Sequence, residues 1–110
     1  MHIAILTFQG FNELDSFIAL GLLNRIKKTD WKVTICCPEP TVTSMNGVTV
    51  HAQARLADAR TADAVIVGSD IKTREVVNDA AMMAELQLDP SRQLIAAQCS
   101  GTLVLAKLGI

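Results

Sequence analysis

Four short apolar runs, separated by longer and more polar segments, most limit how this chain can fold. They cover Ile3–Phe8, Lys32–Cys37, Ala64–Val67 and Gln93–Gln98. Runs that are apolar throughout, rather than at every second position, are typical of strands that a parallel sheet buries on both faces. Parallel neighbours cannot be joined by a tight turn, so the segments between these runs must cross over the sheet.

Three of the other segments have the apolar spacing of helices. The first covers about Glu13–Lys27 and follows Asn12, a residue type that favours the N-cap position. The second covers about Lys72–Leu88, and the third covers Thr102–Leu108 with Gly109 at the position of a C-cap. The alternation of strands and helices predicts a doubly wound α/β domain, with a mainly parallel sheet and helices on both of its faces.

A small β-hairpin is predicted between the second and third runs. Asn46-Gly47 is a strong signal for a tight hairpin turn, and β-favouring residues flank it at 43–45 and 48–50. A short helix at Leu56–Arg60 is predicted to follow.

The length of 110 residues fits one domain, 1–110, but we expect that domain to be incomplete at its C-terminal end. The last strand of a doubly wound sheet is often central, and only one further helix follows Gln93–Gln98 here. A bare apolar sheet edge is a feature that proteins normally avoid. A further segment or a second chain is therefore expected to complete the domain.

The charge pattern argues against nucleic acid and membranes as partners. Lysine and arginine total 10 against 11 acidic residues, so the net charge of −1 gives no basic surface for DNA or RNA. No apolar stretch approaches the ~18 residues of a membrane span, and no signal peptide is recognisable. Cys36, Cys37 and Cys99 have neither the pattern of a disulfide framework nor that of a zinc site. We expect a cytoplasmic protein without a metal or a cofactor.

Cys99 is the strongest candidate for a functional residue. The sequence Ala97-Gln98-Cys99-Ser100-Gly101 joins a predicted strand to a predicted helix, which is the context of a nucleophile elbow. Such a turn needs small neighbours, and Ala97 and Gly101 are small. The thiol would lie at the carboxyl end of the sheet and at the start of a helix, where partial positive charge favours the thiolate. The alternative is a buried structural cysteine, but the strand–turn–helix context favours the nucleophile.

Loops after the first and third strands are expected to open at the same edge of the sheet as Cys99. Asp15, in the first helical turn, is placed to reach the thiol, although an acid there also complements the helix dipole. Both interpretations of Asp15 remain open on the residues alone. The glycine at Gly68 allows backbone N–H groups to approach an oxyanion together with the N–H of Ser100.

Three other ionisable residues receive no role in this site. His2 and His51 are not expected at the carboxyl edge of the sheet, so no thiolate–imidazole pair is predicted. Glu13 is expected to be solvated.

The residues together resemble the ThiJ/PfpI family, within the class I glutamine amidotransferase-like superfamily. The resemblance covers the whole chain, including the 10–15 loop, the Asn46-Gly47 hairpin, the turn at Leu56-Ala57-Asp58 and the Gly68 loop. Its most specific part is the stretch Leu94–Gly101 with the residues that follow it. Domains of this family run well beyond 110 residues, in agreement with the expectation of a missing portion.

The resemblance implies a flavodoxin-like sandwich, usually dimeric, that acts on a small molecule. The family nucleophile falls on Cys99, the acid that hydrogen-bonds it falls on Asp15, and the backbone donors of the oxyanion hole fall near Ser69 and Ser100. Leu14 followed by Asp15 resembles the isonitrile hydratase-like branch and the sensor domains of some transcription regulators.

Two departures from the family pattern matter. Protease-type members carry histidine directly after the cysteine, where this chain has Ser100, and this puts peptidase activity in doubt. The paired glycines after the third strand are here Gly68-Ser69, a change that keeps a backbone donor.

The sequence thus predicts a cysteine-dependent hydratase or hydrolase acting on a small electrophile such as an isonitrile, an aldehyde or an amide. Two alternatives stay open. In the first, the protein is a redox or stress sensor without turnover, in which Cys99 is oxidised. In the second, the chain is the sensor domain of a transcription regulator.

Overall fold

A sheet of five parallel strands in the order β5-β2-β1-β6-β7 forms the centre of the protein in this computed structural model, which describes residues 1–110. All four strand pairs in this sheet are parallel. Four of the strands confirm the apolar runs, whereas β5 has two residues and is too short to give a periodic pattern. The strands are β1 His2–Leu6, β2 Lys32–Cys37, β5 Ala54–Arg55, β6 Ala64–Val67 and β7 Leu94–Ala97.

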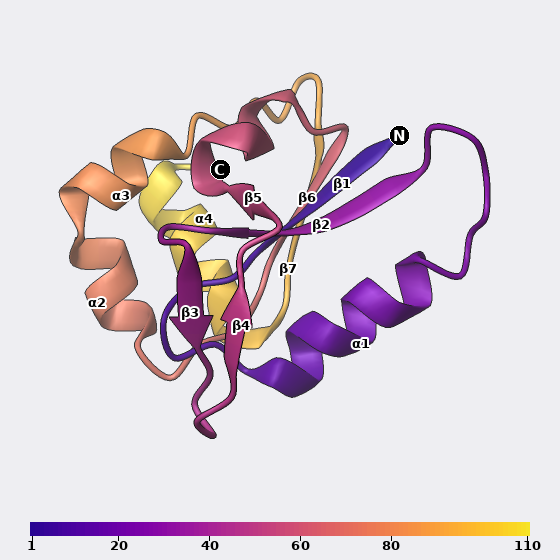
Figure 1. The fold of residues 1–110 in the computed structure, drawn as a ribbon. Helices are drawn as coiled ribbons and strands as arrows, with labels where there is room; N and C mark the ends of the chain where they lie inside the picture. The colour runs from indigo at the N-terminus through magenta and orange to yellow at the C-terminus, as the bar shows by residue number, and fades with distance from the viewer.

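Helices cover both faces of this sheet, as predicted for a doubly wound fold. Helix α1 lies on one side, and α2, α3 and α4 lie together on the other (Figure 1). Two 3₁₀-helices complete the set, η1 before β6 and η2 between β7 and α4. The bounds are α1 Glu13–Leu23, η1 Leu56–Thr61, α2 Thr73–Asn78, α3 Ala80–Glu85, η2 Cys99–Gly101 and α4 Thr102–Leu108.

Helix α1 begins where the sequence predicts and ends four residues earlier. Asn12 caps its start, because the side-chain oxygen accepts the N–H of Leu14 at 3.0 Å. At the other end, the indole N–H of Trp31 donates to the carbonyl of Leu23 at 2.9 Å. The Trp31 side chain thus satisfies a carbonyl of the last helical turn. The helix ends at Leu23 and does not continue to Lys27.

The prediction of a single helix over 72–88 is wrong, because the helical conformation is interrupted at Asp79. This residue has φ −84° and ψ 96°, an extended conformation that ends α2. Its carboxylate accepts the N–H of Met82 at 3.0 Å and so caps the start of α3. Aspartate is among the residues that favour this position, which explains why a new helix starts here.

The predicted hairpin is present, but its turn is wider than Asn46-Gly47 alone suggests. Strands β3 Thr41–Thr43 and β4 Thr49–His51 pair antiparallel, and residues 44–48 form the loop between them. The hydroxyl oxygen of Ser44 accepts the N–H groups of Asn46 and Val48 at 3.2 and 2.9 Å. The N–H of Val48 thus donates to the side chain of Ser44 rather than to its backbone carbonyl, and the regular pairing ends at Thr43.

Glu13, whose carboxylate is exposed to solvent as expected, also holds this hairpin loop against the start of α1. Its carboxylate accepts hydrogen bonds from the hydroxyl of Ser44 and the side-chain amide of Asn46. The bond from Ser44 is the main reason that the pKa of Glu13 lies below its ordinary value, with the bond from Asn46 second. The hairpin is therefore anchored close to the carboxyl end of β1.

The core is built on both faces of the central strand β1. Ala4 and Leu6 point into the larger apolar cluster under α2, α3 and α4, while Ile3 and Ile5 pack in a smaller cluster with residues of α1. Alternate residues of a strand face opposite sides of the sheet. Burial of both sets explains why the run is apolar throughout rather than at every second position.

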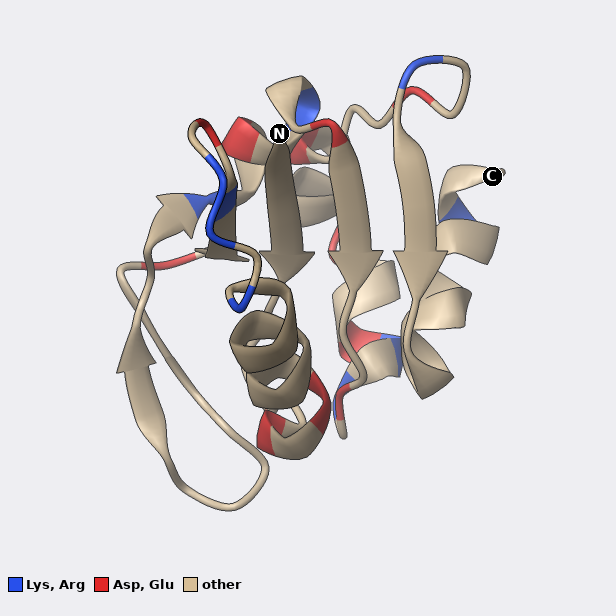
Figure 2. Cartoon of the chain, turned by 90° about the vertical axis from the view of Figure 1, so that its right-hand side faces the viewer, with Lys and Arg blue, Asp and Glu red and all other residues tan.

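One part of the sheet is left uncovered. On the side of α1, no helix lies in front of β6 and β7 (Figure 2). A hollow of about 340 Å³ there is lined only by apolar residues, and Leu94 at its edge is 74% exposed. Strand β7 has a neighbour on one side only.

None of the helices combines the length and the apolar character needed to span a bilayer.

Candidate active site at the Cys99 turn

Cys99 lies two residues after the end of β7 and opens η2, in the strand–turn–helix position of a nucleophile elbow. Its φ angle is +48°, in the left-handed region that costs a residue with a side chain roughly 1–2 kcal/mol. The residue is exposed, so its thiol is open to a reactant. Strain of this kind persists only where the surrounding structure enforces it, and it clusters at functional sites.

Gly101 shows what enforces this turn. A Cβ atom at this position would lie 2.3 Å from the carbonyl oxygen of Val67 and 2.8 Å from that of Gly68. The turn after β7 therefore packs directly on the backbone at the end of β6. Only glycine allows so close an approach, which gives the physical reason for the small residue expected here.

A cavity of about 260 Å³ adjoins Cys99 at the carboxyl edge of the sheet, where doubly wound folds bind ligands. Its walls come from the loops after β1, β6 and β7 and from the hairpin loop. They are formed by Asn12, Met45, Ser69, Asp70, Ile71, Cys99 and Ser100. The structure thus brings three of the predicted site residues, Ser69, Cys99 and Ser100, to one cavity.

Ser100 ties the cysteine turn to the loop after β6. Its hydroxyl oxygen accepts the N–H of Asp70 at 3.1 Å and the hydroxyl of Thr73 at 2.9 Å, and its own proton can go to the carbonyl of Asp70 at 3.2 Å. These bonds join residues about 30 positions apart in the sequence. They fix the residue next to the nucleophile and so help to hold Cys99 in its strained conformation.

Asp15 lies behind the cavity wall rather than in it. Its carboxylate accepts a hydrogen bond from the hydroxyl of Ser69 at 2.5 Å, and no hydrogen bond joins it to Cys99. The backbone of Ser69 is held as well, because its carbonyl accepts the N–H of Asn12 at 2.9 Å. Ser69, which lines the cavity, therefore links the predicted acid to the cavity wall.

The predicted backbone donors differ in their availability. The N–H of Gly68 already donates to the carbonyl of Leu6 at 3.2 Å. The N–H of Ser69 lies outside every helix and strand and has no partner. Ser100 is in the first turn of η2, where N–H groups lack a carbonyl within the helix. Of the three predicted donors, Ser69 and Ser100 are thus the two whose N–H groups have no partner in the fold.

Asp70 is a cavity residue that the sequence interpretation did not single out. Its Oδ1 accepts the N–H of Lys72 at 2.6 Å, while its Oδ2 is buried without a partner. Burial raises the pKa of this carboxyl to about 6. A carboxyl group directly after Gly68-Ser69 is the signal that could have found it, because that loop was already placed at the edge of the sheet.

The remaining cysteines and histidines lie away from this cavity. Cys36 and Cys37 are 0% and 2% exposed, and burial raises the pKa of both thiols, that of Cys37 to about 12. His2 lies at the start of β1, within 2.7 Å of the Thr34 hydroxyl, and His51 lies in β4. No group of three or more His, Cys, Asp or Glu side chains is placed to hold a metal ion.

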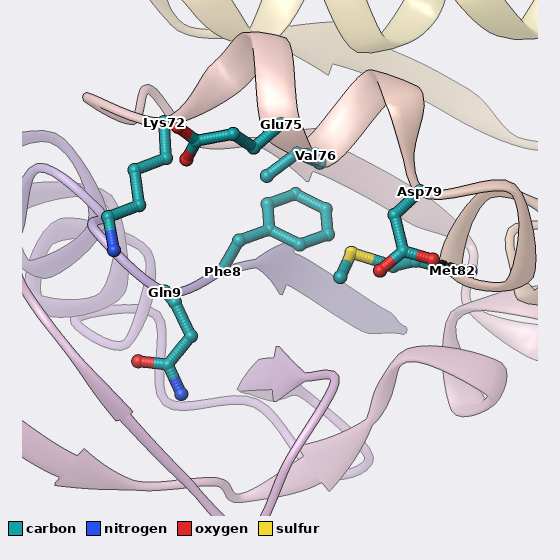
Figure 3. Close-up of a pocket in the computed structure, with 7 residues that line it drawn as sticks. All are labelled: Phe8, Gln9, Lys72, Glu75, Val76, Asp79 and Met82. Atoms are coloured by element: carbon teal, nitrogen blue, oxygen red, sulfur yellow. Dashed lines mark hydrogen bonds between the residues drawn. The ribbon is translucent and has the colours of Figure 1, made fainter.

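A second hollow near the same edge has a different character. It measures about 170 Å³ and lies between the end of β1 and helices α2 and α3, with Phe8 and Val76 side by side at its apolar wall (Figure 3). No cysteine, serine or histidine lines it. It offers no nucleophile, so the cavity beside Cys99 is the better candidate for chemistry.

Comparisons with known proteins place this geometry in context. A family model described as the DJ-1/PfpI family matches residues 1–110. Oxidised DJ-1 from Toxoplasma gondii superposes with a TM-score of 0.79 at 21% identity, covering 98% of this chain and 61% of that one. DJ-1beta from Drosophila melanogaster gives 0.79 at 23% identity, covering 99% and 60%.

A cysteine-to-alanine variant of a DJ-1 superfamily protein from Salmonella typhimurium gives a TM-score of 0.78 at 21% identity, covering 98% of this chain and 60% of that one. No curated protein matches the chain significantly. The likeness to the solved structures shows the shared flavodoxin-like fold. The chain spans about three fifths of the length of these three structures.

Proposed function

The chain belongs to the DJ-1/PfpI family, and from this premise we propose that it is an enzyme whose nucleophile is Cys99. The proposed substrate is a small molecule with an electrophilic carbon, such as an isonitrile, an aldehyde or an amide. The observation that carries the proposal is an exposed cysteine at φ +48° beside a cavity at the carboxyl edge of the sheet. The family includes proteases and hydratases.

In the proposed reaction, the Cys99 thiolate adds to the electrophilic carbon and forms a carbon–sulfur bond. In a carbonyl substrate the displaced electron pair moves to the oxygen, where negative charge develops. The backbone N–H groups of Ser69 and Ser100 border the same cavity and would donate to that charge. In an isonitrile the displaced electron pair neutralises the positive nitrogen, and the negative charge stays on the attacked carbon.

An amide loses its amine together with a proton and leaves a thioester, whereas the isonitrile carbon takes a proton and becomes a thioimidate. An α-oxoaldehyde such as methylglyoxal forms a hemithioacetal, and the proton on its sulfur-bound carbon moves to the neighbouring carbon to give a thioester. Water then adds to the carbon bound to sulfur and Cys99 leaves as the thiol, which releases an acid or an N-substituted formamide.

The cavity favours a small substrate. Its volume of about 260 Å³ lies below the ~300–1,000 Å³ of drug-sized ligand pockets. Ser100, where protease-type members have histidine, is bonded to Asp70 and Thr73 and offers no imidazole base. Both observations support a hydratase or hydrolase rather than a peptidase.

Steady-state assays with a series of isonitriles and with methylglyoxal test this proposal. Turnover is expected for at least one substrate in the wild-type protein, and Cys99→Ala is expected to abolish it. A matched control is Cys37→Ala, which removes a thiol whose burial keeps it protonated. No turnover with any substrate, or equal turnover in Cys99→Ala, would contradict the enzyme proposal.

A redox sensor is the second candidate, because Cys99 is the exposed cysteine whereas Cys36 and Cys37 are buried. Mild peroxide would then oxidise Cys99 first, along the path from sulfenic to sulfinic acid. Mass spectrometry of peptides after peroxide treatment measures this directly. Oxidation of Cys36 or Cys37 ahead of Cys99 would rule the sensor out.

We also propose that the protein acts as a homodimer, in line with the usual state of the family. Helix α1 exposes three apolar side chains at a spacing of four residues, Leu14, Ile18 and Leu22, which are 66%, 56% and 60% exposed. Residues four apart lie on one helix face, so these side chains form a continuous apolar stripe. Sedimentation of wild type and Ile18→Glu tests it: the variant is expected to lose the association that this stripe supports, and unchanged sedimentation would contradict the dimer.

A further inference from the structure

Apart from the nucleophile itself, Asp70 is the one residue with an ionisable side chain among those that line the Cys99 cavity. The other residues of the wall are uncharged: Asn12, Met45, Ser69, Ile71 and Ser100. Met45 and Ile71 are 43% and 65% exposed, so they form part of its open rim. No lysine or arginine lines the cavity, and a negative charge in its wall therefore meets no opposite charge there.

The loop after β6 holds Asp70 close to Cys99. The N–H of Asp70 donates to the hydroxyl oxygen of Ser100 at 3.1 Å, and that hydroxyl lies 3.2 Å from the carbonyl of Asp70. Ser100 follows Cys99 directly in the chain. On the side chain of Asp70, Oδ1 accepts the N–H of Lys72 while Oδ2 is buried without a partner. Solvent therefore screens this carboxylate only in part, and its field reaches the cavity.

Asp70 also lacks an ion-pair partner. Neither of the two salt bridges in the structure involves it. Lys72, two residues further along the chain, lines the second hollow instead (Figure 3). Because burial raises the pKa of Asp70 only to about 6, the carboxyl is mostly ionised at pH 8. Charges away from water are normally paired, so an unpaired carboxylate beside a nucleophile points to a role in function.

We propose that Asp70 is a specificity-determining residue, which keeps anionic substrates away from Cys99 and leaves the cavity to uncharged electrophiles; this inference rests on the proposed function. The carboxylate of a 2-oxo acid would meet a like charge in a partly desolvated site, where repulsion is stronger than in bulk water. Uncharged isonitriles, aldehydes and amides meet no such repulsion, and Met45 and Ile71 offer contact to an apolar substituent. Asp70 acts through its field and forms no bond to the substrate.

Alkylation of Cys99 by iodoacetate, an anion, and by iodoacetamide, which is uncharged, tests the proposal. Both reagents react with the thiolate, so the ratio of their rates does not depend on how much thiolate is present. At pH 8 and low salt, Asp70→Asn is expected to raise the iodoacetate-to-iodoacetamide ratio at least about threefold. Mass spectrometry of the peptide that contains Cys99 measures both rates.

Two further variants separate the position of the charge from its mere presence. Asp89→Asn is the matched control, because it changes the net charge equally at an exposed residue before β7, at the opposite edge of the sheet. It should leave the ratio unchanged. Asn12→Asp adds a second carboxylate to the cavity wall and keeps an equally good cap for α1. It should lower the ratio about threefold. In about 0.5 M salt the differences among the variants should shrink.

An equal ratio in Asp70→Asn and Asp89→Asn would overturn the proposal, as would an unchanged ratio in Asn12→Asp. A Cys99 that reacts with neither reagent would overturn it as well. Circular dichroism identifies any variant that has lost its fold. The wild-type ratio, expected to lie at least about threefold below that of 2-mercaptoethanol, then decides. Alkylation needs no turnover, so failure of the enzyme proposal would be seen separately, in the substrate assays.

Discussion

At the scale of single residues, the contact between Gly101 and the end of β6 can be tested directly. Gly101→Ala is expected to lower the free energy of unfolding by at least about 2 kcal/mol, because the new Cβ would overlap the carbonyl oxygen of Val67. Urea unfolding measures the loss. Gly21→Ala is the matched control, since no atom lies within 4 Å of its added Cβ. In the interior of α1 that change should stabilise by about 0.5–1 kcal/mol. Equal effects at the two glycines would contradict the packing argument.

The position of the reactive residue could be predicted from the sequence, whereas its surrounding hydrogen bonds could not. Cys99 and the need for a small residue at Gly101 follow from local context, a strand followed closely by a helix. The bond between Ser69 and Asp15 joins residues 54 positions apart, so it depends on how closely two loops meet in the fold. Spacing along the sequence carries no information on that distance. Asp70 was missed for the same reason, because its burial is set by neighbouring loops.

The Asp70 carboxyl predicts a pH-dependent stability. Its pKa is about 6 in the folded protein and near its ordinary value when unfolded, so the folded state binds more protons between about pH 4 and pH 6. Stability should therefore fall as pH rises through this window. The loss is about 1 kcal/mol, because the group is only partly buried and solvent screens it.

Asp70→Asn should remove this contribution, as seen by urea unfolding at a series of pH values. The comparison variant is Asp89→Asn. Hydrogen bonds from Ser91 lower the pKa of Asp89, so its contribution to stability is lost as pH falls. The two variants should thus change the pH dependence of the free energy of unfolding in opposite senses. If Asp70→Asn left the slope between about pH 4 and pH 6 unchanged, Asp70 would not be its source.

At the scale of secondary structure, four strands of the parallel sheet were predicted well because each lies in an apolar run, whereas the two-residue strand β5 was not predicted. The helices were less well predicted, because their ends depend on side-chain partners. Trp31 ends α1 from outside the helix, and Asp79 divides one apolar periodicity into two helices. Both residues act through hydrogen bonds that periodicity alone does not reveal.

Asp79→Ala should cost about 1 kcal/mol of the free energy of unfolding, because the N–H of Met82 at the start of α3 loses its acceptor. Asp79→Asn keeps an equivalent acceptor and should stay within a few tenths of a kcal/mol of wild type. Guanidinium unfolding of the three proteins measures the difference. If Asn proved as costly as Ala, the lost charge rather than the lost cap would be responsible.

At the scale of the whole molecule, the parallel sheet and its helices on both faces were predicted from the order of elements. The prediction of an incomplete domain stays a proposal, which the uncovered apolar face of β6 and β7 supports. We propose that a further polypeptide segment covers this face, because about two fifths of each of the three similar solved structures lies outside the part that this chain matches.

Residues 1–110 expressed alone should therefore bind a hydrophobic dye and self-associate at this face. Leu94→Glu should reduce both effects and change the free energy of unfolding by less than about 0.5 kcal/mol, because this side chain is already 74% exposed. Dye fluorescence and sedimentation measure them. The matched control is Leu103→Glu, which places the same charge at a half-exposed position of α4, on the opposite face. Monomeric wild type without dye binding would contradict the proposal.

The position of β1 at the centre of the sheet has a consequence for synthesis on the ribosome. Strand β1 leaves the exit tunnel before both of its neighbours, β2 on one side and β6, which ends at Val67, on the other. The nascent chain therefore cannot complete the hydrogen bonds of β1 until the residues up to Val67 have emerged. Until then β1 is an apolar strand without its second neighbour, and it is the segment on which a chaperone would act.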